Sequence, residues 1–149
     1  MGFIGDDPIS GKSENLMPAI INVHKGIKPK LEIFGNDYDT KDGTGIRDYI
    51  HIMDLARAHL NSIDYIENNS GLNIFNLGTG KGISVLELIN TFEKVTGSSL
   101  PKVFKERRIG DAAYCYANPQ KARKLLKWEA LSDVEDMCLS AYNFSKLET

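Results

Sequence analysis

The sequence predicts a mixed α/β fold in which short strands alternate with amphipathic helices, and three observations lead to that prediction. The chain has 149 residues, 42% of them hydrophobic, so a domain of ordinary size can bury a core. Apolar residues recur at helical spacing between capping and stop residues. The remaining apolar runs are short. The pattern is therefore typical of a substrate-binding lobe, or of half of a larger fold, and not of a complete doubly wound domain.

Capping residues and apolar stripes define the expected helices. Ser84 and Glu87 form a capping box, and Gly97 ends the helix that they open. Asp54 is expected to cap a second helix. The inward face of that helix is expected to carry Leu55, Ala58, Ile63 and Ile66. The other expected helices cover residues 14–25 with Ser13 as N-cap, a short stretch opened by Asn118 and Pro119, and residues 132–146 opened by Ser132 with Glu135.

Short apolar runs between these helices are expected to form strands. The expected strands cover residues 31–34, 46–52, 73–77, 102–104 and 114–117. Residues 35–45 and 105–111 are polar loops. Long polar loops inside a compact domain are usually functional.

Composition excludes several classes of protein. The formal net charge is -2, which argues against a nucleic-acid partner held mainly by phosphate charge. No apolar run approaches the roughly 20 residues that span a membrane, and the first residues lack the features of a signal peptide. Cys115 and Cys138 do not make a disulfide framework. These observations predict a cytoplasmic protein with no membrane partner.

Three familiar functional patterns are absent, imperfect or out of context. His24, His51 and His59 share no metal-ligand spacing, so we expect no metal site. The glycine-rich stretch 78–82 follows a predicted strand, but its third glycine comes too early for a dinucleotide fingerprint, which favours a tight turn over a ligand-facing one. Tyr142 and Lys146 have Tyr-x-x-x-Lys spacing, but they lie on an ordinary amphipathic helix and are expected to be structural.

Basic residues on the loops give a stronger signal. Arg47 follows a glycine-rich loop, and Arg108 precedes Gly110 and Asp111. Guanidinium forks suit a diphosphate, and a nearby carboxylate can accept hydrogen bonds from a ribose diol. Phe34 offers a flat face for a base. Asn15 opens a helix, where it could bond a sugar or a phosphate. The alternatives are a surface salt bridge for Arg47 and a loop ion pair for Arg108.

Several stretches together resemble a known family. They are residues 14–18, 33–38, 76–80, 107–111 and the run Asp-Gly-Thr-Gly-Ile-Arg-Asp-Tyr-Ile-His over 42–51. In order and spacing they are similar to the C-terminal part of the UDP-glucose 4-epimerase family, within the extended short-chain dehydrogenases. The resemblance covers essentially the whole chain, so residues 1–149 are expected to form one UDP-sugar-binding domain.

The resemblance implies a reaction and a division of labour. Members interconvert UDP-glucose and UDP-galactose by transient oxidation at C4 with tightly bound NAD, are commonly homodimers, and serve galactose metabolism. Their NAD-binding Rossmann domain and catalytic Ser or Thr, Tyr and Lys lie N-terminal to the region matched here. The chain alone is therefore expected to lack turnover and stable NAD, and to bind UDP weakly at best. It is also expected to expose an apolar inter-domain face.

The resemblance also assigns binding roles to residues of this chain. The backbone of Glu32 and Ile33, with Phe34, would hold uracil; Arg47 and Arg108 would bind the diphosphate; and Asp111 would accept the ribose hydroxyls. Asn15 and Leu16 would line the hexose and diphosphate side, and Tyr49 and Val85 the nucleotide pocket. Glu14 departs from the Asn that members often carry. Cys115 stands where some members have Tyr, and its small side chain would admit UDP-N-acetylhexosamines unless it is ordinary packing.

Three interpretations remain at this point. The first is the UDP-sugar lobe of a 4-epimerase. The second is a stand-alone nucleotide-sugar binding module without catalysis. The third, a related dehydratase or decarboxylase, is disfavoured by the run over residues 42–51.

Overall fold

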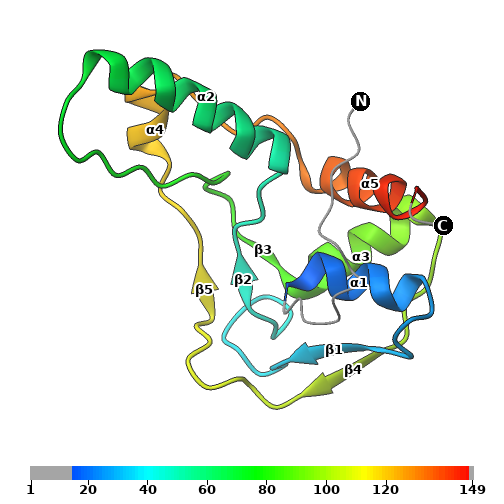
Figure 1. The fold of residues 1–149 in the computed structure, drawn as a ribbon. Coiled ribbons are helices and arrows are strands. Elements are labelled where there is room, and N and C mark those ends of the chain that lie inside the picture. Colours follow the sequence, from blue (N-terminus) through cyan, green and yellow to red (C-terminus); the bar gives the residue numbers. More distant parts are fainter. Residues whose placement is uncertain (1–14, 148–149) are drawn as a thin grey trace.

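A lobe and an arm, joined by a small sheet, make up the fold (Figure 1). The computed structural model describes residues 15–147. The lobe contains the helices α1 (Leu16–His24), α3 (Val85–Thr96) and α5 (Val134–Ser145), and the strands β1 (Leu31–Phe34) and β4 (Lys102–Lys105). The arm contains α2 (Ile52–Asn68), the extended segment 69–77, α4 (Gln120–Leu125) and residues 126–131. The joining sheet consists of β2 (Ile46–Arg47), β3 (Ile83–Ser84) and β5 (Tyr114–Cys115).

The strand register fixes which loops meet. β1 runs parallel to β4, with Leu31 opposite Lys102 and Phe34 opposite Lys105. β2 lies between β3 and β5 and is parallel to β5, so Arg47 lies opposite Cys115. The polypeptide after β1 and the polypeptide after β4 therefore leave the lobe at the same end, and both return to the joining sheet.

The core of the lobe is built from the inward faces of its three helices and of β1. Phe92 is fully buried, with its ring edge-on to those of His24 and Tyr142 at centroid distances of 5.7 and 6.2 Å. The Nζ of Lys146 lies 3.9 Å from the centroid of the Tyr142 ring. Tyr142 is thus a packing residue, as its place on an amphipathic helix predicts. The buried core residues are Ile20, Ile21, Val23, Leu31, Ile33, Leu88, Ile89, Phe92, Leu100 and Cys138.

Helix starts agree with the sequence at α3 and differ at α2 and α5. Ser84 accepts a hydrogen bond from the N–H of Glu87 at 3.0 Å, and Gly97 ends α3 with φ of 69°. α2 begins earlier than predicted, because the Nδ1 of His51 caps it by accepting from Met53 N–H. α5 opens on a capping box of Asp133 and Asp136, one residue beyond the predicted pair. The predicted cap Ser13 lies outside the described residues.

Asp54 has a different role from the cap that the sequence predicts. Its side chain is fully buried and accepts hydrogen bonds from the backbone N–H groups of Leu131 and Ser132, at 3.2 and 2.9 Å. Its backbone carbonyl accepts from the indole N–H of Trp128 at 2.8 Å. Asp54 therefore ties the beginning of α2 to the segment that precedes α5.

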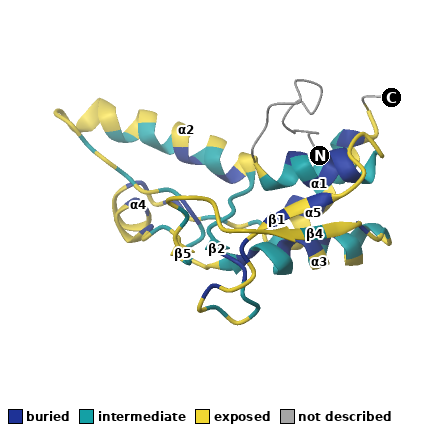
Figure 2. Cartoon of the chain, turned by 90° about the horizontal axis from the view of Figure 1, so that it is seen from below, coloured by how far each residue is buried: buried dark blue, intermediate teal, exposed yellow. Residues whose placement is uncertain are grey.

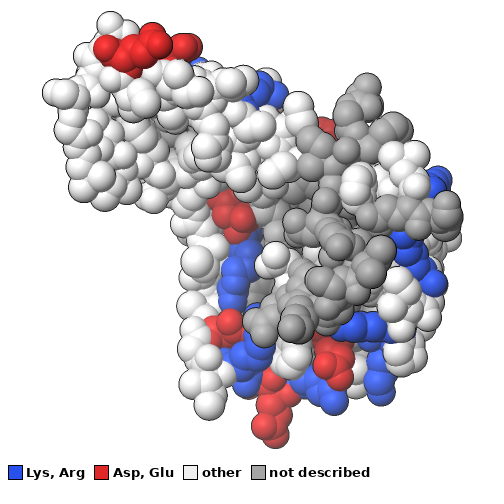
Figure 3. Space-filling view, viewed as in Figure 1, with Lys and Arg blue, Asp and Glu red and all other residues white. Residues whose placement is uncertain are grey.

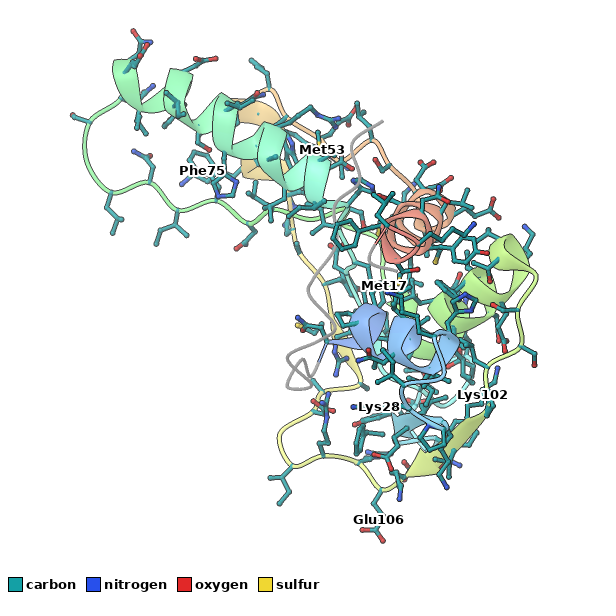
Figure 4. All side chains as sticks on the ribbon, turned by 45° about the vertical axis from the view of Figure 1, so that its right-hand side comes forward. Met17, Lys28, Met53, Phe75, Lys102 and Glu106 are labelled. Atoms are coloured by element: carbon teal, nitrogen blue, oxygen red, sulfur yellow. The ribbon has the colours of Figure 1, made fainter. Side chains whose placement is uncertain are left out.

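The arm departs most from the predictions. Ile63 and Ile66, expected to face inward, are 52% and 62% exposed. Segment 73–77 is extended, and its exposure alternates as in a strand, but no strand of residues 15–147 pairs with it. Phe75 lies against α2, with its ring edge-on to that of Tyr65 at 5.3 Å (Figure 4). The predicted strand over 46–52 ends at Arg47, where the chain turns toward α2. No helix within the described residues is long and apolar enough to cross a membrane.

Candidate functional site

The polar loop 35–45 docks on the N-terminus of α3. Thr44 is fully buried, and its hydroxyl accepts from Leu86 N–H at 3.2 Å. The carbonyl of Gly45 accepts from Val85 N–H at 3.1 Å. Helix N-termini leave backbone N–H groups without partners, and the loop supplies those partners here. The loop is thereby fixed directly before β2, which carries Arg47.

Asp48 closes the glycine-rich turn 78–82. Its carboxylate accepts from the N–H groups of Thr79 and Gly80, at 2.9 and 3.0 Å, and from Ala117 N–H at 3.1 Å. A Cβ at Gly78 would lie 2.4 Å from the same carboxylate, so only glycine fits. The turn is structural, as the sequence favours. The sequence analysis did not single out Asp48. The signal that could have found it is an acid directly after the strand residue Arg47, in a chain whose glycine-rich turn needs an acceptor for its N–H groups.

Phe34, Arg108, Asp111 and Arg47 form a continuous cluster. The Arg108 guanidinium carbon lies 5.1 Å from the centroid of the Phe34 ring. Arg108 Nε donates to Asp111 Oδ2 at 2.9 Å, and Arg47 Nη2 lies 3.8 Å from Asp111 Oδ1. The side chains come from the end of β1, the loop between β4 and β5, and β2. The predicted convergence of these side chains is therefore present.

The two guanidinium groups are held differently. Arg47 Nη1 donates to the carbonyls of Ile46 and Ala112, both at 2.8 Å, so the backbone fixes its position and its side chain is 28% exposed. Arg108 uses Nε for Asp111, and no residue of 15–147 accepts from its terminal nitrogens. Since a guanidinium has five N–H donors, Arg108 keeps donors for an anion. Figure 3 shows the acidic and basic side chains mixed at this end of the lobe.

The second edge of β1, beside Phe34, has no partner strand among residues 15–147. Leu31 N–H donates to the carbonyl of Pro101, the residue before β4, at 2.7 Å, and Gly35 N–H donates to the carbonyl of Lys105 in β4 at 2.9 Å. Backbone groups alternate along a strand, so those of Ile33 face β4 while those of Glu32 and Phe34 face away. The Ile33 side chain is buried in the core of the lobe. Glu32 Oε1 lies 3.5 Å from Lys105 Nζ, in an ion pair with β4.

The remaining predicted site residues are Asn15, Leu16, Tyr49, Val85 and Cys115. Leu16, Tyr49 and Val85 pack against the core of the lobe. Burial raises the pKa of the Tyr49 phenol to about 12, with the charge of Arg47 opposing the shift. Asn15 precedes α1 at its N-cap position. Cys115 lies opposite Arg47, and its side chain is exposed.

The histidines and the glycine-rich turn have structural partners among the described residues. No three His, Cys, Asp or Glu side chains gather within residues 15–147. His24 packs in the lobe, His51 caps α2, and the Nδ1 of His59 lies 2.8 Å from the Leu55 carbonyl oxygen. The glycine-rich turn cannot take a pyrophosphate, because Asp48 occupies the N–H groups of Thr79 and Gly80.

A family model decides the relationship of the chain to known proteins. The model described as GDP-mannose 4,6 dehydratase matches residues 8–140. The chain belongs to this family. Within it, the UDP-glucose 4-epimerase of Bacillus subtilis is 48% identical over 143 residues, which are 96% of this chain and 42% of that protein. The chain thus spans less than half the length of the curated relatives that it matches.

Solved structures of this family confirm the fold. The UDP-glucose-4-epimerase of Stenotrophomonas maltophila, with NAD and formylated UDP-arabinopyranose, matches with a TM-score of 0.89 and 42% identity over 93% of this chain and 41% of that chain. The UDP-glucose 4-epimerase of Bifidobacterium longum, with NAD+ and UDP, matches with a TM-score of 0.85 and 46% identity over 89% and 39%. The mixed α/β fold of this chain, lobe and arm together, corresponds to the C-terminal part of these family members.

Proposed function

We propose that this chain forms the UDP-sugar-binding part of a UDP-glucose 4-epimerase, which interconverts UDP-glucose and UDP-galactose in the cytoplasm as a step of galactose metabolism. One observation carries the proposal. Side chains from β1, β2 and the β4–β5 loop converge on a single cluster of one ring, two guanidinium groups and one carboxylate. Relatives of the same fold hold UDP or a UDP-sugar together with NAD, which supports the proposal.

The uracil base would lie beside Phe34 and the second edge of β1. The face of uracil can stack on the Phe34 ring, which is 38% exposed. The edge of uracil carries one N–H donor between two carbonyl acceptors. The outward C=O and N–H groups of Glu32 and Phe34 complement that edge, because they present both acceptors and donors. The expectation that the backbone of Ile33 also holds uracil is corrected here, because its backbone groups face β4, and Ile33 contributes by holding the strand on the core of the lobe.

The diphosphate would lie between Arg108 and Arg47. A hydrogen bond between charged groups contributes about 1.5–3 kcal/mol, so two forks can hold two phosphates. Asp111 accepts a hydrogen bond from Arg108 and forms an ion pair with Arg47. When the phosphates take over the guanidinium groups, the Asp111 carboxylate becomes free to accept the ribose hydroxyls.

The hexose would lie beyond the diphosphate, toward the joining sheet and α1. We assign Asn15 and Leu16 to its diphosphate side, and Tyr49 and Val85 to the wall of the nucleotide pocket. The exposed thiol of Cys115 would leave room for an N-acetyl group.

In the complete enzyme, Cys115→Tyr should abolish turnover of UDP-N-acetylglucosamine and spare UDP-glucose. Equal activity on both sugars would remove Cys115 from the sugar end.

The redox chemistry would belong to a part of the protein outside these 149 residues. NAD supplies a hydride acceptor when bound, and we place its site and the catalytic Ser, Tyr and Lys in that part. The exposed apolar face of α2 and segment 72–77 would pack against it. We expect the complete enzyme to be a homodimer, and these 149 residues to show no turnover alone.

Calorimetric titration with UDP tests the binding role. We expect weak but measurable binding to the chain, a loss of roughly tenfold or more in Arg108→Ala, and unchanged affinity in Arg123→Ala. Arg123 lies on α4 and pairs with Glu129, so its substitution removes an equal charge far from the cluster. Affinity unchanged in Arg108→Ala would remove Arg108 from the site.

A second candidate function is a binding module that has no catalytic partner. The observation in its favour is that the Phe34–Arg47–Arg108–Asp111 cluster is assembled entirely from described residues. An epimerase assay on the complete protein separates the two functions, since a binding module would bind UDP-glucose without converting it.

A further inference from the structure

Arg107, the neighbour of Arg108, holds a different part of the chain. Its Nε donates to Asp37 Oδ1 at 2.7 Å, and its Nη2 donates to the backbone carbonyl of the same residue. Its guanidinium carbon lies 4.2 Å from the centroid of the Tyr38 ring. Arg107 therefore donates to both the carboxylate and the backbone carbonyl of Asp37 and stacks on the ring of Tyr38. These contacts join the loop after β4 to the loop after β1.

This contact is more than an isolated surface ion pair. The side chains of Arg107 and Asp37 are 45% and 68% exposed, and a single pair with that exposure contributes little. The ring of Tyr38, however, is buried beneath the guanidinium. The Arg107 hydrogen bond lowers the pKa of the Asp37 carboxyl, although partial burial opposes the shift, so the pair stays charged at neutral pH.

Gly35 shows how closely these groups are packed. A Cβ at Gly35 would lie 2.4 Å from Cε2 of Tyr38 and 3.1 Å from Cγ of Arg107, and its φ of +85° also requires glycine. Gly35 N–H donates to the carbonyl of Lys105 at 2.9 Å. The loop after β1 and the loop after β4 are therefore in close contact directly after Phe34 and directly before Arg108.

The geometry points to Arg107 as the residue that positions Arg108 over Phe34. The two arginines are consecutive, and their side chains go to different partners, Arg107 to Asp37 and Tyr38, and Arg108 to Phe34 and Asp111. Glu106, just before them, projects away from the lobe (Figure 4). Without the contacts of Arg107, the loop between β4 and β5 would still be held by Arg47 at Ala112 and Asp111. The start of the loop, directly before Arg108, would lose its side-chain tie to the loop after β1. Arg107 is a positioning residue that needs no contact with the ligand. This inference rests on the proposed function of the cluster.

A double-mutant cycle on UDP binding tests the inference with the 149-residue chain. We expect Arg107→Ala to weaken UDP binding by roughly tenfold, and Arg107→Lys to restore little, because a lysine cannot grip two oxygens in a fork. The double variant of Arg107→Ala with Arg108→Ala should bind no more weakly than Arg108→Ala alone. Arg123→Ala is the control for the lost charge. Additive losses would mean that Arg107 binds the ligand directly, and unchanged binding in Arg107→Ala would overturn the inference while the role of Arg108 stood.

A second measurement tests whether Arg107 positions Arg108, and it does not require UDP to bind. The Nε–H of Arg108 donates to Asp111 beside the Phe34 ring, so its NMR signal should be shifted by the ring and slow to exchange. We expect Arg107→Ala and Asp37→Asn to return that signal to the shift of a free arginine. A signal that stays in place in both variants would overturn the inference. UDP that fails to bind the wild-type chain would instead count against the proposed function.

Discussion

The lobe and the arm differ in how completely they bury their apolar residues. The lobe surrounds Phe92, Leu88 and Ile89, each at most 1% exposed. The arm has a small core of Ala58, Ala122, Leu126 and Trp128. Most of the outer face of α2 is exposed (Figure 2). On the arm, Leu60, Ile63, Ile66, Leu72 and Ile74 are all more than half exposed.

This difference shows which structure the chain specifies by itself. The lobe builds a buried core from its own helices and β1, and the Phe34–Arg47–Arg108–Asp111 cluster lies where the lobe meets the joining sheet. Within residues 15–147, the apolar face of α2 stays largely exposed and no strand pairs with segment 73–77. Monomeric proteins rarely expose contiguous apolar surface of this kind. We therefore expect changes in the lobe to alter folding and changes on the arm face to alter association.

The largest effect should come from Phe92→Ala in the core of the lobe. This substitution removes a fully buried ring and its contacts with His24 and Tyr142, which costs about 3–5 kcal/mol of unfolding free energy. Urea unfolding followed by far-UV circular dichroism measures the loss. Phe104→Ala, at a site 43% exposed, is the matched control and should cost much less. Equal losses in the two variants would mean that the lobe core does not dominate stability.

The arm should unfold before the lobe. Trp128 is the only tryptophan of the chain, is 3% exposed, and lies in the small core of the arm, so its fluorescence reports on the arm alone. We expect its urea midpoint to fall below the midpoint of the helical dichroism signal, which comes from both parts. Local stability follows the amount of buried apolar contact, and the arm has little. Coincident transitions would show instead that the two parts fold as one cooperative unit.

Asp42 should make the junction of loop and lobe sensitive to acid. Burial alone would raise the pKa of its carboxyl, but hydrogen bonds from Ser84 and Thr44 bring it below the usual 3.8. Because the pKa is lower in the folded chain, the stabilisation is complete above the unfolded value, near 3.9, and disappears as pH falls through the folded value. Asp42→Asn should lose about 1 kcal/mol at pH 7 and lose less on acidification than the wild type.

Urea midpoints measured between pH 7 and pH 3 check this behaviour. Asp39→Asn, on the exposed part of the same loop, is the control and should follow the wild-type curve. If Asp42→Asn lost stability with acid as steeply as the wild type, other carboxyl groups would have to carry the acid dependence.

The sequence predicted the lobe better than the arm, for a physical reason. The stripe that ends at Gly97 and the box at Ser84 describe a helix whose partners lie in the same chain, and α3 formed as expected. The stripe of α2 was equally clear, but Ile63 and Ile66 find no partner among the described residues. Periodicity shows which face is apolar and not whether anything covers it. The same limit explains segment 73–77, which has the alternation of a strand without a neighbour.

The Phe34–Arg47–Arg108–Asp111 cluster was predictable where the contacts are local in sequence and not where a residue acts through a distant one. A loop ion pair of Arg108 with Asp111 was the alternative that the sequence left open, and the structure contains that pair. Asp48 and Arg107 were missed, because their partners lie far away in sequence, in the turn 78–82 and at Asp37. A single sequence gives no distance between such segments. What marks both residues is the fold, which brings their loops together.

The smallest effect on folding, and the sharpest test of the comparison, should come from the arm face. Ile63→Lys and Ile66→Lys replace side chains that are already exposed, so the unfolding free energy should stay within about 0.5 kcal/mol of the wild type. The same changes place charge on the apolar face, so sedimentation velocity should show less self-association than in the wild-type chain. Glu67→Lys, on the same helix, is the control and should leave association unchanged. A large loss of stability in the isoleucine variants would show that the arm face is packed in solution, and the contrast with the lobe would then disappear.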